Sequence, residues 1–280
     1  MKSIWNRTGI IFILFVSSFA NCWSHDGDGH DRELREVLFG ENAYRLSEQG
    51  ELYFRLLCEA SYLTLDLYNT DSKGKLYIDD LRKNGVKNLP SIESIMYNSN
   101  SLHGRYTHLG WEHNYVVDKA NWKARKTILL ETVKRIGNFK DNERIKLDAF
   151  AALVYEIHVL GDHIGDSDYS RYTRIRLVSE PDYKGQEVSP TSDGPFNNPT
   201  LYIYFLYHIQ RLFREQKTSY EFTQMIGFLN RHKNQFVSSK ERPVPYDDIQ
   251  FLAKKTKQEL VRYLPTLLVK ERFFKEAFYK

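Results

Sequence analysis

The sequence predicts an all-α protein, a single-domain bundle of about seven helices. Apolar residues recur every three or four positions in several separate segments, which is the period of an α-helix. Alternating or β-branched runs typical of strands are scarce. The hydrophobic fraction of 41% and the aromatic fraction of 14%, in 280 residues, are enough for one sizeable core or two small ones.

The first 22 residues are typical of an export signal. Lys2 and Arg7 supply a positive start, and residues 10–20 (IIFILFVSSFA) supply the apolar run. That run has the length of a signal-peptide core, and it is shorter than the roughly 20 apolar residues that span a bilayer. We therefore expect these residues to direct export and to lie outside the folded domain.

Two processing routes stay open at the end of this segment. "FANC" resembles a loose bacterial lipobox, which would place a lipid on Cys22. Cleavage after Cys22 would instead make Trp23 the first mature residue. Either route predicts a folded domain over residues 23–280 that is periplasmic, secreted or lipid-anchored at the cell envelope.

The first half of the domain contains two clear helices. Residues 31–40 carry leucine and valine at helical spacing and end at a glycine, and residues 47–68 continue an apolar repeat. Turn-forming residues at 69–75 (NTDSKGK) end the second helix. Residues 77–115 are irregular, with one short helix predicted at 91–97.

The second half predicts five further helical segments. Residues 121–137 place tryptophan, leucine, isoleucine and valine along one stripe, and a second segment ends in "HVLG". A proline in the first turn is compatible with a helix that starts at 199. The predicted segments are 121–137, 147–161, 199–216, 219–231 and 246–279.

Charge and cysteine content exclude some classes of protein. Lys+Arg 40 against Asp+Glu 36 gives a formal net charge of +4, which is too mild to indicate nucleic-acid binding by charge alone. Cys58 is the one cysteine that both processing routes keep in the domain, so no disulfide framework is expected. The long polar stretch at 169–197 is of a length that is often functional.

Ionisable residues gather in the stretch 156–168, "EIHVLGDHIGDSD", directly after a strongly apolar run. His158 and Asp162 are one helical turn apart and share a face. A buried imidazole and carboxylate without a further partner are costly, and a divalent metal would remove that cost. Zinc suits this mixture of nitrogen and oxygen ligands. Gly161, just before Asp162, would let another backbone segment or a ligand approach closely.

Other histidines are also candidate metal ligands. His30 follows the predicted mature N-terminus, His108 lies in the irregular region, and His208 sits inside an apolar helix. The remaining loop histidines are more typical of solvated surface residues.

The segment "FAALVYEIHVLGDHIGDSD" resembles the zinc-ligand helix of the all-α zinc-dependent phospholipase C and single-strand-specific nuclease superfamily. That family has a helix with His, two apolar residues, Gly and Asp, as in residues 158–162. The resemblance implies that Trp23 at the mature N-terminus, His30, His108, His158 and Asp162 are metal ligands, for one to three zinc ions.

The chain departs from the family pattern at two places. Asp168 stands where the family has a histidine, and His208 is followed at +4 by Leu212 where the family has a carboxylate. With these departures, the resemblance implies Asp168 and His208 as further ligands. It implies Asp162, Asp166 and Asp168 as candidate catalytic carboxylates.

The expected function is hydrolysis of a phosphoester, with a phospholipid or a nucleic acid as substrate and possible association with a membrane surface. No protein partner is inferred. One alternative is a non-catalytic exported or lipid-anchored protein with a structural or vestigial metal site. A phosphohydrolase of the HD type, built on His30-Asp31, fits less well because that fold needs a separate earlier histidine and His25 is too close.

Overall fold

The chain is all-α in the part that the computed structural model describes, which is residues 28–65, 72–95, 111, 119–165, 199–233 and 246–280. The predicted class is confirmed, but these residues form ten α-helices rather than about seven. None of the described helices is long and apolar enough to cross a membrane. The α-helices are α2 (Asp28–Phe39), α3 (Glu48–Leu65), α4 (Ser72–Lys83), α5 (Ile92–Ile95), α6 (Lys119–Gly137), α7 (Arg144–Gly165), α9 (Pro199–Leu212), α10 (Tyr220–His232), α11 (Tyr246–Leu268) and α12 (Arg272–Phe278).

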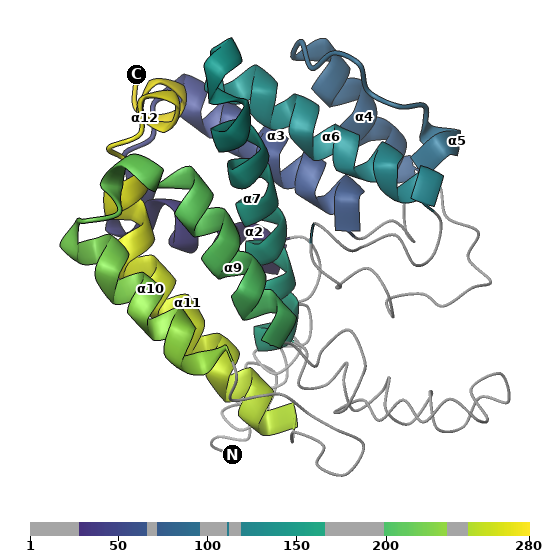
Figure 1. Ribbon diagram of the computed structural model, residues 1–280. Coiled ribbons are helices and arrows are strands. Elements are labelled where there is room, and N and C mark those ends of the chain that lie inside the picture. Colours follow the sequence, from purple (N-terminus) through teal and green to yellow (C-terminus); the bar gives the residue numbers. More distant parts are fainter. Residues whose placement is uncertain (1–27, 66–71, 96–110, 112–118, 166–198, 234–245) are drawn as a thin grey trace, which may run out of the picture.

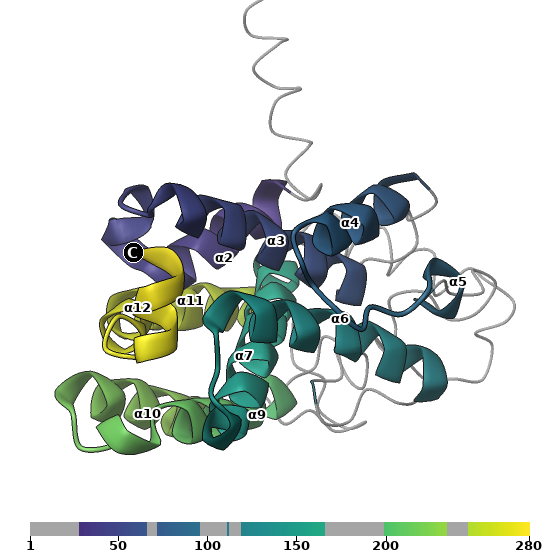
Figure 2. The same cartoon turned by 90° about the horizontal axis from the view of Figure 1, so that it is seen from above.

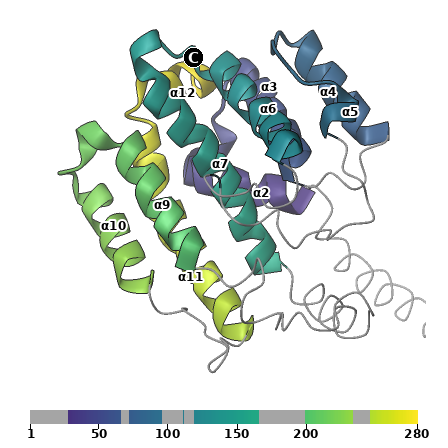
Figure 3. The same cartoon turned by 45° about the vertical axis from the view of Figure 1, so that its right-hand side comes forward.

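The helix α7 is the centre of the fold (Figures 1 and 3). It packs against α2, α3, α6, α9 and α11. Every residue from 149 to 161 is buried. A helix that is apolar on all sides belongs in a core, which explains why the run "AFAALVY" shows no polar face.

The other helices surround α7 in groups. Seen from above, α2, α3 and α4 lie on one side, α9 and α10 on the opposite side, and α7 between them (Figure 2). The C-terminal α12 packs on α3 and α6. Phe39 at the end of α2 contacts Phe54, Phe274 and Phe278, with ring centroids 5.0 to 5.6 Å apart. These aromatic contacts join the first and last helices into one hydrophobic core.

The predictions for two stretches outside α7 were wrong. Residues 72–75, expected to form a turn, and residues 77–83, expected to be irregular, belong to α4. Its apolar stripe is short, with Ile78 and Leu81 buried. The segment 246–279, expected to be one helix, divides into α11 and α12. The chain turns at Lys270, and Glu271 takes an extended conformation at the N-cap of α12.

Glu271 is held at this break by a buried polar network. Its carboxylate accepts hydrogen bonds from Lys146 Nζ at 2.8 Å and from Gln216 Nε2 at 2.7 Å. Its side chain is 5% exposed and that of Lys146 is 16% exposed. The network therefore ties the start of α7, the turn after α9 and the start of α12 to one carboxylate, in a place where water cannot replace it.

We expect Glu271→Ala to lower the free energy of unfolding by roughly 2–3 kcal/mol, because buried donors lose their acceptor. Urea denaturation measures this change. Arg82→Ala is the control, since Arg82 pairs with Asp79 at an exposed place, and its expected cost is below about 1 kcal/mol. Equal losses in the two variants would contradict the importance of the buried network.

Candidate functional site

Two predicted metal ligands, His30 and His158, meet where α2 crosses α7. Their imidazole rings are stacked, with centroids 4.1 Å apart and planes inclined by 16°. His30 lies one turn before Leu34 and shares its face, and the burial of Leu34 and Leu38 turns that face toward the core. The amphipathic pattern of α2 thus aims His30 at α7. Neutral imidazoles stack without charge repulsion, and the neutral form is the one that binds metal.

Gly161 makes this crossing possible. A Cβ atom at position 161 would lie 2.8 Å from Glu33 Oε2 and 2.9 Å from His30 Nδ1. Both distances are shorter than normal van der Waals contact, so a larger residue would displace the two side chains. The expected close approach at Gly161 occurs, but the groups that approach are the side chains of His30 and Glu33 rather than a backbone segment or a ligand.

Ser61 on α3 fixes the other side of the His158 ring. Its Oγ lies 3.0 Å from His158 Nδ1, in a buried hydrogen bond. Ser61 is 2% exposed and His158 is 5% exposed. The histidine therefore contacts a group from α2 on one side and a group from α3 on another, which holds its ring in one orientation.

Glu33 adds a carboxylate beside His30. Its Oε1 accepts from Lys257 Nζ on α11 at 3.3 Å, and the same ammonium lies 2.7 Å from Glu36 Oε2. Burial raises the pKa of the Glu33 carboxyl above its ordinary value, and Lys257, followed by His30, works against that rise. The carboxylate is thus placed by α2 and anchored by α11.

The pair His158 and Asp162 lies inside α7 rather than at its end. The sequence predicted a helix that stops at Gly161, but α7 continues to Gly165. Glycine inside the helix is accepted here because α2 needs the space. The backbone of Asp162 is helical, one turn after His158, as predicted, while its side chain lies outside what the structure describes.

Four predicted site residues lie outside the described residues: Trp23, His108, Asp166 and Asp168. The proposed signal segment 1–22 and the polar stretch 169–197 also lie outside them.

His208 occupies a separate place in the core, on α9. It is fully buried, and neither ring nitrogen has a hydrogen-bond partner among the described residues. Its ring lies beside those of Tyr204 and Tyr207, at centroid distances of 6.3 and 5.1 Å. Burial lowers the pKa of His208 to about 3, with the nearby Asp148 acting against that effect. None of these contacts joins His208 to His30 or His158.

Asp31 points away from His30, toward α3. Asp31 raises the pKa of the Cys58 thiol, which burial already raises well above its ordinary value, so this cysteine stays protonated. Successive residues on a helix point about 100° apart. His30 and Asp31 therefore face different helices, α7 and α3, which counts against an HD-type dipeptide that holds one metal.

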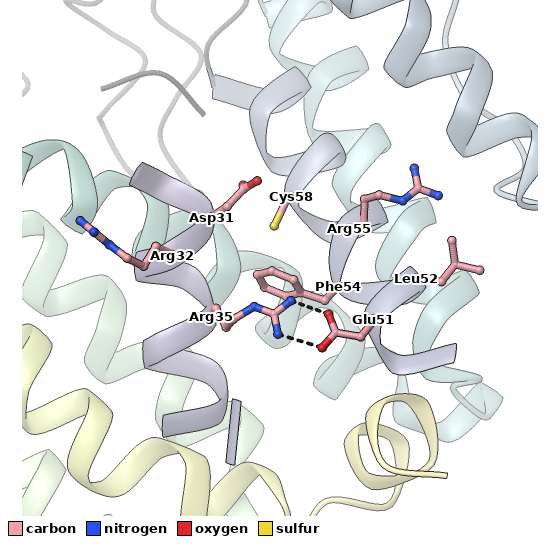
Figure 4. Close-up of a pocket in the computed structure, with 8 residues that line it drawn as sticks. All are labelled: Asp31, Arg32, Arg35, Glu51, Leu52, Phe54, Arg55 and Cys58. Carbon is pink, nitrogen blue, oxygen red and sulfur yellow. Dashed lines mark hydrogen bonds and ion pairs between the residues drawn. The ribbon is translucent and has the colours of Figure 1, made fainter. Parts of the chain in front are cut away.

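A pocket of about 630 Å³ opens between α2 and α3 on the Asp31 side (Figure 4). Arg35 crosses it to Glu51, with hydrogen bonds of 3.0 and 2.5 Å, and lies 4.4 Å from the centre of the Phe54 ring. Arg55 is bound by Glu59 and Asp80. Carboxylates thus neutralise these guanidinium groups, so the pocket has no strong net charge. The pocket is lined by Asp31, Arg32, Arg35, Glu51, Leu52, Phe54, Arg55 and Cys58.

The described residues do not by themselves form a metal site, because no three His, Cys, Asp or Glu side chains among them form a group that would hold an ion. The lone pairs of an imidazole lie in the plane of its ring, and the planes of His30 and His158 are nearly parallel. The two rings therefore do not act as two ligands of one ion in this arrangement. A complete site would need further ligands from the side chain of Asp162 or from residues outside the described ranges.

Comparisons of the chain with protein-family models, with curated proteins and with solved structures found no match.

The sequence did not indicate three residues of this site, namely Ser61, Glu33 and Lys257. Glu33 had a detectable pattern, because it follows His30 by three positions and so shares its helix face. Ser61 and Lys257 had none, since each lies on a helix far along the chain from the histidines that it approaches.

We expect Gly161→Ala to destabilise the protein by roughly 1–2 kcal/mol, because the new methyl group pushes against the stacked His30 ring and the Glu33 carboxylate. Gly227→Ala in α10 is the matched control. A Cβ there would meet only Arg231 Nη1, at 3.4 Å. The higher helix propensity of alanine should therefore raise the free energy of unfolding by about 0.5–1 kcal/mol. Thermal denaturation compares the two, and stabilisation by both would disprove the close crossing.

The burial of neutral His208 makes stability depend on pH. Because its folded pKa of about 3 is below the unfolded value, this contribution is complete above about pH 6.5 and is lost as the pH falls from there toward 3. The expected loss between pH 7 and pH 5 is about 2 kcal/mol. In urea denaturation, His208→Phe should no longer lose this free energy of unfolding between pH 7 and pH 5. The control His232→Phe should lose it as the wild type does. An unchanged pH profile in His208→Phe would refute the prediction.

Proposed function

We propose that the chain binds zinc where His30 meets His158, and that it is an exported, metal-dependent phosphoester hydrolase. The observation that carries the proposal is that α2 brings His30 against His158 on α7, with ring centroids 4.1 Å apart. They belong to helices far apart in the sequence, and the resemblance to the zinc-dependent phospholipase C and nuclease superfamily had implied both as ligands. Because the ring planes are nearly parallel, the two histidines would serve neighbouring ions rather than one shared ion.

Within this proposal, each residue of the site has a distinct task. His30 and His158 offer ring nitrogens, and Asp162, one turn after His158 on α7, supplies a carboxylate on the same helix face. Gly161 keeps the space in which these groups converge. Glu33 balances the local charge and is itself held by Lys257.

Bound zinc would polarise a phosphoryl oxygen and lower the pKa of a water molecule. The proposed catalytic carboxylates are Asp162, Asp166 and Asp168, and Trp23 and His108 stay proposed as additional ligands. His208 is left out of this set, because its contacts are with Tyr204, Tyr207 and the pair of Asp148 and Arg211.

The second candidate function is a non-catalytic exported or lipid-anchored protein with one structural metal. The low exposure of His158 and Ser61, 5% and 2%, favours it, because structural zinc sites are closed whereas catalytic sites keep a position open for substrate. In both candidates the all-α helices form one domain over residues 23–280. The substrate of the hydrolase would be a phospholipid or a nucleic acid, and a membrane surface is a proposed site of action.

We expect the purified mature chain to contain at least one zinc ion, and His30→Ala and His158→Ala each to lose it, since each removes a nitrogen ligand. Elemental analysis measures the zinc. His232→Ala, a change to a histidine near the end of α10, is the control and should retain the metal.

Activity separates the two candidate functions. Hydrolysis of bis(p-nitrophenyl) phosphate that disappears in His158→Ala supports the hydrolase. Retained zinc without hydrolysis supports the structural site, and a wild-type chain without zinc refutes both.

A further inference from the structure

Helices α10 and α11 lie side by side and run in opposite directions (Figures 1 and 3). Tyr220 at the start of α10 contacts Tyr263 near the end of α11, with ring centroids 6.3 Å apart. Glu221 pairs with Lys270, just after α11, at 3.5 Å. Because a helix rises about 1.5 Å per residue, Arg231 at the far end of α10 comes level with the second turn of α11.

The exposed side of this helix pair carries positive charge. Among the side chains that the structure describes on residues 220–232 and 251–268, the exposed ones include no aspartate or glutamate. Asp247 and Asp248, in the first turn of α11, have side chains outside what the structure describes. Four exposed side chains are cationic: Arg231, Lys254, Lys255 and Arg262. Together with Phe251, these four residues define the basic face.

The basic face is one continuous surface. On α11, Phe251, Lys255 and Arg262 recur at helical spacing and form a single stripe. On α10, Tyr220 and Arg231 lie three turns apart on another stripe. In each helix, a residue that contacts the partner helix comes one position after a stripe residue, which is a rotation of about 100°. Because the helices are antiparallel, this equal offset turns both stripes toward the same side of the pair.

The cations of the basic face are not neutralised by the part of the chain that the structure describes. Lys257, which faces inward from the same helix, pairs with Glu33 at 3.3 Å and with Glu36 at 2.7 Å. No carboxylate of the described residues forms such an ion pair with a cation of the basic face. A surface that stays positive in this way attracts a negatively charged partner.

Phe251 indicates which anionic partner fits this face. Its side chain is 59% exposed, although phenylalanine is usually buried. The Lys255 ammonium lies 4.3 Å from the centre of the Phe251 ring and covers one face of it. Nucleic-acid bases stack on open aromatic faces. A lipid surface needs no open face, because an aromatic ring enters among the headgroups while neighbouring lysines reach the phosphates.

We propose that the basic face of α10 and α11 binds the surface of membranes that contain anionic phospholipids. Arg231, Lys254, Lys255 and Arg262 contact the lipid phosphates, and Phe251 enters the boundary between headgroups and acyl chains. The inference rests on the membrane association in the proposed function and names the surface responsible. It requires neither zinc nor catalysis.

The first experiment measures sedimentation of the mature chain, without lipid on Cys22, with vesicles of phosphatidylcholine and phosphatidylglycerol. Each cation near an anionic surface strengthens binding about fivefold. The double variant Lys254→Gln/Lys255→Gln should therefore bind roughly 10- to 30-fold more weakly. The control Lys83→Gln/Lys87→Gln changes the net charge equally, at exposed lysines of another region, and should stay within about threefold.

A second pair of variants tests the aromatic anchor. Phe251→Ser should weaken binding to the same vesicles by about tenfold or more, because the ring no longer leaves water. Leu76→Ser removes an apolar side chain of α4 that is 65% exposed and should stay within about threefold. All the substituted side chains of the basic face are exposed, and circular dichroism of each variant checks that its helices are intact.

The outcomes separate this proposal from its rivals. A wild-type chain that does not sediment with the anionic vesicles overturns it, and so does an equal loss in the two double-lysine variants. Binding of a single-stranded DNA oligonucleotide through Lys254 and Lys255, without vesicle binding, would assign the face to nucleic acid instead. Because bis(p-nitrophenyl) phosphate is soluble, vesicle binding without its hydrolysis overturns the hydrolase alone. Hydrolysis without vesicle binding overturns the role of the basic face alone.

Discussion

The close crossing of α2 over α7 at Gly161 is the constraint on which the rest of the site depends. Without a side chain at that position, the His30 ring and the Glu33 carboxylate reach the surface of α7, where His158 lies one turn earlier. Any larger residue would push α2 outward or turn its side chains away. Glycine has a low helix propensity, which destabilises α7 at this position. The close packing of α2 that glycine allows offsets this cost.

The burial of α7 converts this crossing into a rigid site. Because the middle of α7 is buried, its polar side chains need partners from other segments. His158 contacts Ser61 on α3, and the Glu33 carboxylate beside His30 is anchored by Lys257 on α11. Three helices distant in sequence thus hold side chains within one turn of α7, and a site supported in this way keeps its geometry before a ligand arrives.

The two buried histidines, His158 and His208, have different environments. His158 has a hydrogen-bond partner and a stacked imidazole, whereas His208 is surrounded by tyrosine rings, with neither nitrogen partnered among the described residues. The first environment fixes the orientation of the His158 ring. The second keeps the imidazole neutral, because burial makes the charged form unfavourable and so lowers the pKa of His208.

Sequence patterns alone determined the helical class, most helix positions and the pairing of His158 with Asp162 on one face, because helical periodicity is a local property of the chain. They also pointed to His30 through the resemblance. Local patterns failed where packing decides: α7 runs through Gly161, α4 forms on a short apolar stripe, and α11 ends at a break stabilised by Glu271. Only the tertiary structure brought Ser61 and Lys257 to the histidines, because contacts between distant segments depend on how whole helices pack.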